Sequence, residues 1–172
     1  MKLYKQTSSQ GCLAVCLLQS IDEEITKKKE LELLFEGLQT RSPYSIGVAS
    51  AFVKHYAKDV MIYVDNVYYQ SQLKNEYETE HMRFIHSNVT MEFLDKLNVP
   101  FIVYLSTHTL LKTWDYSPHF VTIESMTDAF YTILEPWSGK RMKVSKKKMI
   151  ESIAELRERV RYCPLIIQVS SS

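Results

Sequence analysis

Apolar residues recur every three to four positions along the first third of the chain. The spacing is clear in residues 12–20 and 23–35, and it returns after Ser42-Pro43, a pair typical of a capped helix start. Such spacing gathers apolar side chains on one helix face, so three helices are predicted. The segment Val67–Leu97 is polar and aromatic, and it is also predicted to be mainly helical.

The later part of the chain replaces helical spacing with short apolar runs of strand length. Turn-forming residues separate two of these runs around Met126-Thr127-Asp128, and their composition favours buried strands. Helical spacing resumes after Ser145, which is expected to start a last helix. The predicted strands are Val60–Val64, Val99–Leu105, Phe120–Ile123, Phe130–Leu134 and Leu165–Val169.

Helices followed by a mostly antiparallel sheet predict an α+β fold. The chain has 172 residues without an evident repeat or boundary, which suits one domain over 1–172. Its helical half would cover about 1–98 and its sheet half about 99–172. A hydrophobic fraction of 45%, with eleven Tyr and seven Phe, is enough for a full core without disulfides.

Charge and cysteine content narrow the function classes. The formal net charge is +1, from 21 basic and 20 acidic residues, so no strong field favours nucleic acid or an anionic membrane as the main partner. No apolar run approaches the roughly 18–20 residues of a membrane span, and the first residues carry no apolar signal region. Three cysteines without zinc-ligand spacing fit a reducing compartment, so we expect a cytoplasmic location.

Cys12 stands where the first predicted helix begins, six residues after Gln6. A helix N-terminus favours the thiolate form of cysteine, because unpaired N–H groups and the positive end of the helix dipole lie there. The thiolate is the nucleophilic form, and a nearby glutamine amide can donate a hydrogen bond to an oxyanion formed beside the sulfur. The pair therefore predicts half of an acyl-transfer site.

His119 and Glu135 complete this hypothesis. His119 begins the strand Phe120–Ile123, and Glu135 ends the next predicted strand. If the two strands form a hairpin, the start of one lies beside the end of the other, which brings the two side chains within hydrogen-bond reach. A histidine base oriented by an acid is the partner that a cysteine nucleophile requires.

The order of these residues resembles the papain-like fold, and more narrowly the C39 peptidase family of bacteriocin-leader-processing and C39-like domains. The resemblance implies that Cys12 is the nucleophile, that His119 is the general base and then acid, and that Glu135 orients His119. It also implies an oxyanion hole formed by Gln6 and the Cys12 N–H, a peptide or protein substrate, and neither a metal nor an organic cofactor. The segments that carry it are Gln6 with Cys12-Leu13-Ala14-Val15-Cys16-Leu17, Val99–Val103, His119–Ile123 and Ile133–Lys140.

Two alternatives to a peptidase stay open. The family usually has Asp-Cys-Gly at the nucleophile and Asp or Asn as third member, whereas this chain has Gly11-Cys12-Leu13 and Glu135. These differences favour a catalytically degenerate C39-like domain that binds a peptide or partner protein without cleaving it. A non-proteolytic acyltransferase or amidase on the same scaffold is the weaker alternative. The sequence does not name the substrate or the oligomeric state.

Tyrosines are dense between residues 63 and 77. Tyr63, Tyr68, Tyr69 and Tyr77 would either line a cleft or coat a polar helix, and the pattern alone does not choose between these outcomes.

Overall fold

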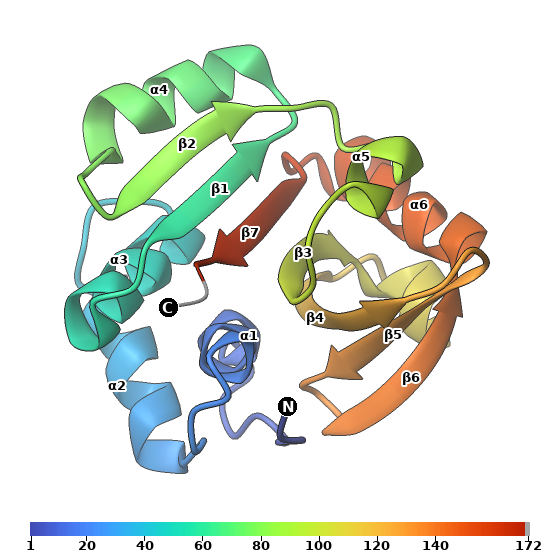
Figure 1. The fold of residues 1–172 in the computed structure, drawn as a ribbon, viewed down its shortest axis with the longest axis horizontal. Helices are drawn as coiled ribbons and strands as arrows, with labels where there is room; N and C mark the ends of the chain where they lie inside the picture. The colour runs from blue at the N-terminus through green and yellow to red at the C-terminus, as the bar shows by residue number, and fades with distance from the viewer. Residues whose placement is uncertain (171–172) are drawn as a thin grey trace.

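The computed structural model describes residues 1–170, in which a seven-stranded sheet forms the centre (Figure 1). The strand order is β2-β1-β7-β3-β4-β5-β6. β1 and β2 pair in parallel, and every other neighbouring pair is antiparallel. The strands are β1 (Val60–Val64), β2 (Met82–His86), β3 (Phe101–Ser106), β4 (Pro118–Met126), β5 (Phe130–Glu135), β6 (Lys140–Ser145) and β7 (Leu165–Val169).

Short polar side chains start several of the helices. Thr26, Asn66 and Ser145 each accept a hydrogen bond from the backbone N–H three residues later, which satisfies a donor that the helix itself cannot pair. The helices are α1 (Cys12–Ser20), α2 (Lys27–Leu38), α3 (Tyr44–Tyr56), α4 (Val67–Tyr77), α5 (Met91–Asp95) and α6 (Lys146–Glu155), with short π-helical turns η1 (His108–Lys112) and η2 (Leu156–Val160).

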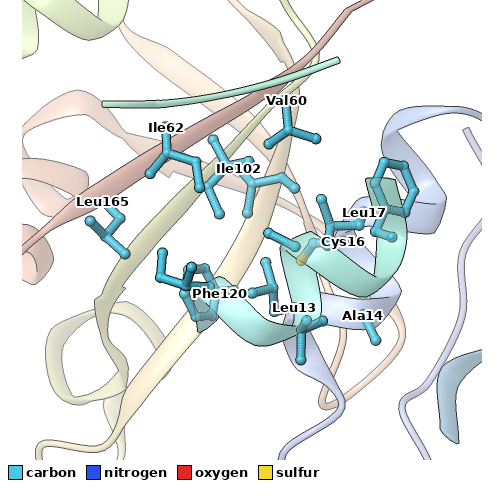
Figure 2. Packing of buried hydrophobic residues seen from close by; sticks show 14 of the residues in the cluster. Leu13, Ala14, Cys16, Leu17, Val60, Ile62, Ile102, Phe120 and Leu165 are labelled. Atoms are coloured by element: carbon cyan, nitrogen blue, oxygen red, sulfur yellow. The ribbon is translucent and has the colours of Figure 1, made fainter. Parts of the chain in front are cut away.

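Both faces of the sheet are buried. One face packs against α1, α2, α3 and α4, with Ile102 of β3 and Phe120 of β4 in this layer. Figure 2 shows Leu13 and Cys16 of α1 in the same cluster as these two strand residues. The next residues along the strands, Val103 and Val121, face the other way and pack with α5 and α6. Burial on two faces explains why β3 is a continuous apolar run rather than an alternating one.

Helix α1 is the central helix of the first layer. Its residues Cys12–Gln19 are all buried, and it packs against α3 and β4 (Figure 1). A helix that is apolar on all sides is buried in this way, between other elements rather than at the surface. The packing fixes the N-terminus of α1, and with it Cys12, against the start of β4.

The predicted α+β fold is confirmed, with N-terminal helices on a mostly antiparallel sheet. The bounds of β1 and β7 are those that the sequence predicts. The helical prediction for Val67–Leu97 is wrong over β2, an edge strand with only Met82 and Phe84 turned inward. The sheet therefore takes two strands from before residue 98, and β6, the other edge strand, has no counterpart among the predicted elements.

Within residues 1–170, no helix has both the length and the apolar character that crossing a bilayer requires.

Candidate active site

Cys12 is the first residue of α1 and is only 6% exposed. Gly11 precedes it, and a side chain at position 11 would collide with the carboxylate of Glu30. The loop before α1 is therefore packed closely enough to require glycine at this position. This packing holds the sulfur at the one end of α1 where the backbone N–H groups are unpaired.

The structure brings His119 and Glu135 together at the β4–β5 hairpin. His119 Nε2 lies 2.8 Å from Glu135 Oε1, and neither side chain has appreciable contact with solvent. Antiparallel pairing of β4 with β5 produces this contact. Thr122 lies opposite Leu134, so His119, which precedes Thr122, and Glu135, which follows Leu134, lie at the same end of the hairpin. The hydrogen bond occupies Nε2 and leaves Nδ1 as the second ring nitrogen.

The turn after β5 holds the carboxylate of Glu135. Trp137 N–H donates to Oε1 at 2.7 Å, while the Ser138 N–H and hydroxyl donate to Oε2 at 2.8 and 2.6 Å. Burial raises the pKa of Glu135, but the bonds from His119 and Ser138 lower it more, to about 2. The indole of Trp137 also lies against the imidazole, with ring centroids 4.6 Å apart. Glu135 is thus an ionised and fixed acceptor for His119.

Cys12 and His119 alter each other's protonation. Burial raises the pKa of the Cys12 thiol, but the interaction with His119 outweighs burial, so the net pKa is lowered. Burial lowers the pKa of His119, but Cys12 and Glu135 outweigh it and raise that pKa to about 9. His119 Nδ1 is buried without a hydrogen-bond partner among the described residues, so this ring nitrogen remains available to the Cys12 sulfur. The directions of these two shifts favour the thiolate–imidazolium form of the pair over the neutral form.

The other two cysteines lack these features. Burial raises the pKa of Cys16 well above its usual value, and burial also raises that of Cys163. Both are free thiols. Cys12 is therefore the only one of the chain's three cysteines whose surroundings favour the anion.

Gln6 lies in a buried position that is tied to the turn after Glu135. Its backbone N–H donates to the Pro136 carbonyl at 2.8 Å, and its side-chain amide donates to the Ser8 carbonyl at 2.7 Å. The amide nitrogen carries a second hydrogen, which that bond leaves free. Gln6 Oε1 is buried without a partner among the described residues. The segment of Gln6 thus connects the turn that holds Glu135 with the loop that leads to Cys12.

Glu30 of α2 is a site residue that sequence reasoning missed. Its carboxylate is fully buried and accepts hydrogen bonds from the Thr7 N–H at 2.9 Å, the Thr7 hydroxyl at 2.8 Å and the Ser8 N–H at 2.9 Å. A buried carboxylate requires such partners, because desolvation of an unpaired charge is costly. Glu30 therefore anchors the loop between Gln6 and Cys12. The local signal for Glu30 is its place on the buried face of α2, at helical spacing from Leu33, Leu34 and Gly37.

Tyr44, at the start of α3, is the second missed residue. Its hydroxyl lies 3.6 Å from Cys12 Sγ and donates to the Gln10 carbonyl at 2.8 Å. Burial and the negative charge of Cys12 both raise the pKa of Tyr44, so it remains a neutral phenol. Its partners are more than 30 residues away in the sequence, so no local signal could have identified it.

Two cavities flank these residues. One of about 460 Å³ includes Tyr104 and Tyr44 in its lining, and the Tyr44 hydroxyl lies 3.6 Å from Cys12 Sγ. Another, of about 570 Å³, includes Glu135 and Trp137 and lies on the side of the histidine–acid pair. Their volumes fall in the roughly 300–1,000 Å³ range of ligand pockets.

This α+β architecture, with a cysteine on the central helix and a histidine on the sheet, is that of a papain-like cysteine peptidase. The model of the Peptidase C39 family matches residues 66–155, just over half of the chain. The chain belongs to the Peptidase C39 family. The matched segment contains His119 and Glu135, whereas Gln6 and Cys12 lie before it. No match was found among curated proteins.

Proposed function

We propose that this chain is a cysteine peptidase, or a related acyl-transfer hydrolase, in which Cys12, His119, Glu135 and Gln6 act on a peptide. The observation that carries the proposal is the buried hydrogen bond between His119 and Glu135, with the second ring nitrogen free for a thiol whose pKa is lowered. A base oriented by a fixed acid and a nucleophile at a helix N-terminus are the parts that acyl transfer needs.

In the first half of the proposed reaction, the Cys12 thiolate attacks the carbonyl carbon of the scissile bond. The carbonyl oxygen becomes an oxyanion, which the Gln6 amide and the Cys12 backbone N–H stabilise. The tetrahedral intermediate then collapses and the C–N bond breaks. The His119 imidazolium gives its proton to the departing amine, and a thioester on Cys12 remains.

In the second half, water cleaves the thioester. Neutral His119 removes a proton from the water as it attacks the acyl carbon, and the same donors stabilise the second oxyanion. Collapse breaks the C–S bond, releases the carboxylic acid and restores the thiolate beside the imidazolium. Glu135 keeps Nε2 protonated throughout, which leaves Nδ1 as the atom that exchanges protons.

The departures from the usual family sequence fit the packing of this chain. Glu135 reaches His119 at 2.8 Å despite its extra methylene. Leu13 is fully buried in the core cluster with Phe120 (Figure 2), so the core accommodates its side chain. Gly11 leaves the space that the Glu30 carboxylate fills. None of the three changes therefore argues for loss of the reaction.

One observation favours the second candidate, a C39-like domain that binds a peptide without cleaving it. Cys12 is 6% exposed, and the Tyr44 hydroxyl stands 3.6 Å from its sulfur. A substrate carbonyl would have to displace this contact. We retain the peptidase as the main proposal, because a binding domain has no need for a thiol of lowered pKa beside an oriented histidine. For either function we propose a single domain acting in the cytoplasm.

Reaction with p-nitrophenyl acetate tests the proposal without a known substrate. An active site of this kind releases a burst of p-nitrophenol close to one equivalent per chain, followed by slower turnover, and mass spectrometry finds the acetyl group on Cys12. The variant Cys12→Ser loses the burst, while the control Cys163→Ser keeps it. Absence of a burst in the unmodified protein, with acetylation spread over surface lysines, would reject the enzyme and favour the binding domain.

A further inference from the structure

We propose that the cavity beside Cys12 is the subsite for an aromatic side chain in the acyl portion of the peptide. This inference rests on the proposed function, because it assigns the substrate class of the same site. The cavity has a volume of about 460 Å³, and we call it the tyrosine pocket. Its lining includes Tyr44, Tyr69, Tyr104, Tyr162, Arg161 and Leu165.

Tyr44 links the tyrosine pocket to the sulfur of Cys12. Tyr44 is both a wall of the pocket and the residue whose hydroxyl lies 3.6 Å from Cys12 Sγ. Tyr104, a second wall, is stacked on Phe120 with ring centroids 4.1 Å apart, and Phe120 follows His119 directly. A negative charge on Cys12 also raises the pKa of Tyr104, after the larger effect of burial. A group in this pocket therefore lies within a residue or two of the atom that Cys12 attacks.

The pocket is on the acyl side of the scissile bond. The leaving amine must stand where the His119 imidazolium can protonate it. The cavity on that side is the one that includes Glu135 and Trp137, which are the hydrogen-bond partner and the ring neighbour of His119. The tyrosine pocket is instead lined by Tyr44, whose hydroxyl lies close to Cys12 Sγ. The portion of the peptide that becomes the thioester therefore occupies the tyrosine pocket.

The chemistry of the lining favours an aromatic occupant. Tyrosine rings offer large apolar faces, and aromatic pairs gain from offset or edge-to-face contact beyond the area that they bury. Tyr104 and Tyr162 already form such a pair at 6.4 Å, next to the cavity. No carboxylate is among the described lining residues, and the only charged one is Arg161, so a lysine or arginine side chain would meet repulsion rather than a partner.

The test uses small chloromethyl ketones as probes of Cys12. In each probe one residue, Phe, Leu, Lys or Gly, is placed first or second from the ketone, and the other position is Gly. The sulfur displaces chloride and forms a thioether, so the rate of inactivation reports how well the varied side chain is accommodated. We expect the Phe probe to react roughly 10- to 100-fold faster than the Gly probe at one of the two positions.

Pocket variants show whether this preference comes from the tyrosine pocket. Tyr69→Ala and Tyr162→Ala should lower the Phe-to-Gly rate ratio several-fold. Tyr162 is half exposed, so its truncation does not endanger folding if Tyr69→Ala proves unstable. Tyr68→Ala is the matched control, because Tyr68 neighbours Tyr69 on α4 and is 84% exposed. That control should keep the ratio of the unmodified protein.

Three results would overturn the inference. The Gly probe could inactivate Cys12 as fast as the Phe probe at both positions. The Leu probe or an octanoyl chloromethyl ketone could react faster than the Phe probe. The Phe-to-Gly rate ratio could also be unchanged in both pocket variants. Reaction of iodoacetamide separates these outcomes from failure of the proposed function, because this reagent is too small to need a subsite. Selective alkylation of Cys12 by iodoacetamide with no aromatic preference rejects the tyrosine pocket alone. If iodoacetamide does not select Cys12, the proposed function falls and the pocket assignment falls with it.

Discussion

His119 Nε2 lies 2.8 Å from Glu135 Oε1, in a position closed to solvent where three donors from the following turn also hold the carboxylate. The arrangement fixes the orientation of the imidazole and keeps a negative charge beside it. Both effects would support the proposed reaction, because a fixed ring leaves Nδ1 available to Cys12 and a negative charge stabilises the imidazolium.

The substitution Glu135→Gln removes the charge and nearly preserves the shape. We expect turnover to fall between about 10- and 10⁴-fold, because the amide neither stabilises the imidazolium nor enforces the tautomer as well. The measurement is the steady-state rate on an acyl substrate. Glu151→Gln, an exposed change on α6, serves as the control and should leave the rate unchanged. An unaltered rate in Glu135→Gln would remove Glu135 from the site.

Glu135→Gln should also change how the free energy of unfolding depends on pH. The pKa of Glu135 is about 2 in the folded chain, below the roughly 4.3 of an unfolded glutamate. A lowered pKa of this kind contributes stability that is complete above the unfolded value and is lost as the pH falls through the folded one. The difference in the free energy of unfolding between the unmodified protein and Glu135→Gln should therefore be largest near pH 5–6, below the range in which His119 titrates, and shrink below about pH 4. Urea titrations at several pH values measure it.

Turnover should follow a bell-shaped pH profile. On the acid side, activity rises as the Cys12 thiol loses its proton, at a pH below its ordinary value because His119 outweighs the effect of burial. On the alkaline side, activity falls as the His119 imidazolium, whose pKa is raised to about 9, loses the proton needed by the leaving group. A profile that rises through an unshifted thiol pKa, with no alkaline limb, would contradict the ion pair.

Gln6→Ala separates an enzyme from a binding domain. An oxyanion donor acts in the transition state, so its loss should lower turnover about 10²–10³-fold and leave the affinity for a non-cleavable peptide nearly unchanged. Gln10→Ala is the control, since the Gln10 side chain is exposed on the same loop. Loss of peptide affinity in Gln6→Ala, without any turnover in the unmodified protein, would assign Gln6 to binding.

Glu30 should act as a positioning residue through the loop it holds. Glu30→Gln replaces acceptors with an amide that cannot receive all the bonds from Thr7 and Ser8, so we expect a lower kcat with little change in KM. Glu32→Gln, at a half-exposed position of the same helix, is the control. A purely structural role would lower Tm and leave the kcat of the folded fraction intact.

A double-mutant cycle with Gly11 tests the same contact. A methyl group at position 11 would collide with the Glu30 carboxylate, so Gly11→Ala should lower turnover in the unmodified background. In the Glu30→Ala background, where the space is free, Gly11→Ala should lower turnover by a clearly smaller factor. Equal losses in the two backgrounds would show that the Gly11–Glu30 contact does not position the loop.

The sequence predicted those geometric features of the candidate site that depend on local patterns. The structure places Cys12 at the start of an apolar helix, and the contact of His119 with Glu135 follows from two successive strands that form a hairpin. The contacts of Glu30 and Tyr44 were not predictable, because their partners lie 22 to 34 residues away and meet them only when α2 and α3 pack beside α1.

The missed strands have a similar explanation. β2 and β6 are edge strands, and each turns few apolar side chains inward, so their alternation is too weak to compete with a helical or loop pattern. The Tyr63–Tyr77 run, which the sequence left open, divides in the structure: Tyr69 lines the tyrosine pocket while Tyr68 is exposed. Neighbouring tyrosines on one helix thus have different surroundings, which only the packing decides.

The most direct test of the ion pair is the pH dependence of alkylation at Cys12, followed residue by residue with iodoacetamide and mass spectrometry. The account predicts a Cys12 titration below the ordinary thiol value of about 8.5, inert Cys16 and Cys163, and a rise of the Cys12 pKa with slower alkylation at pH 6 in His119→Ala. An ordinary thiol titration at Cys12 that His119→Ala does not change would contradict the thiolate–imidazolium pair and the peptidase with it.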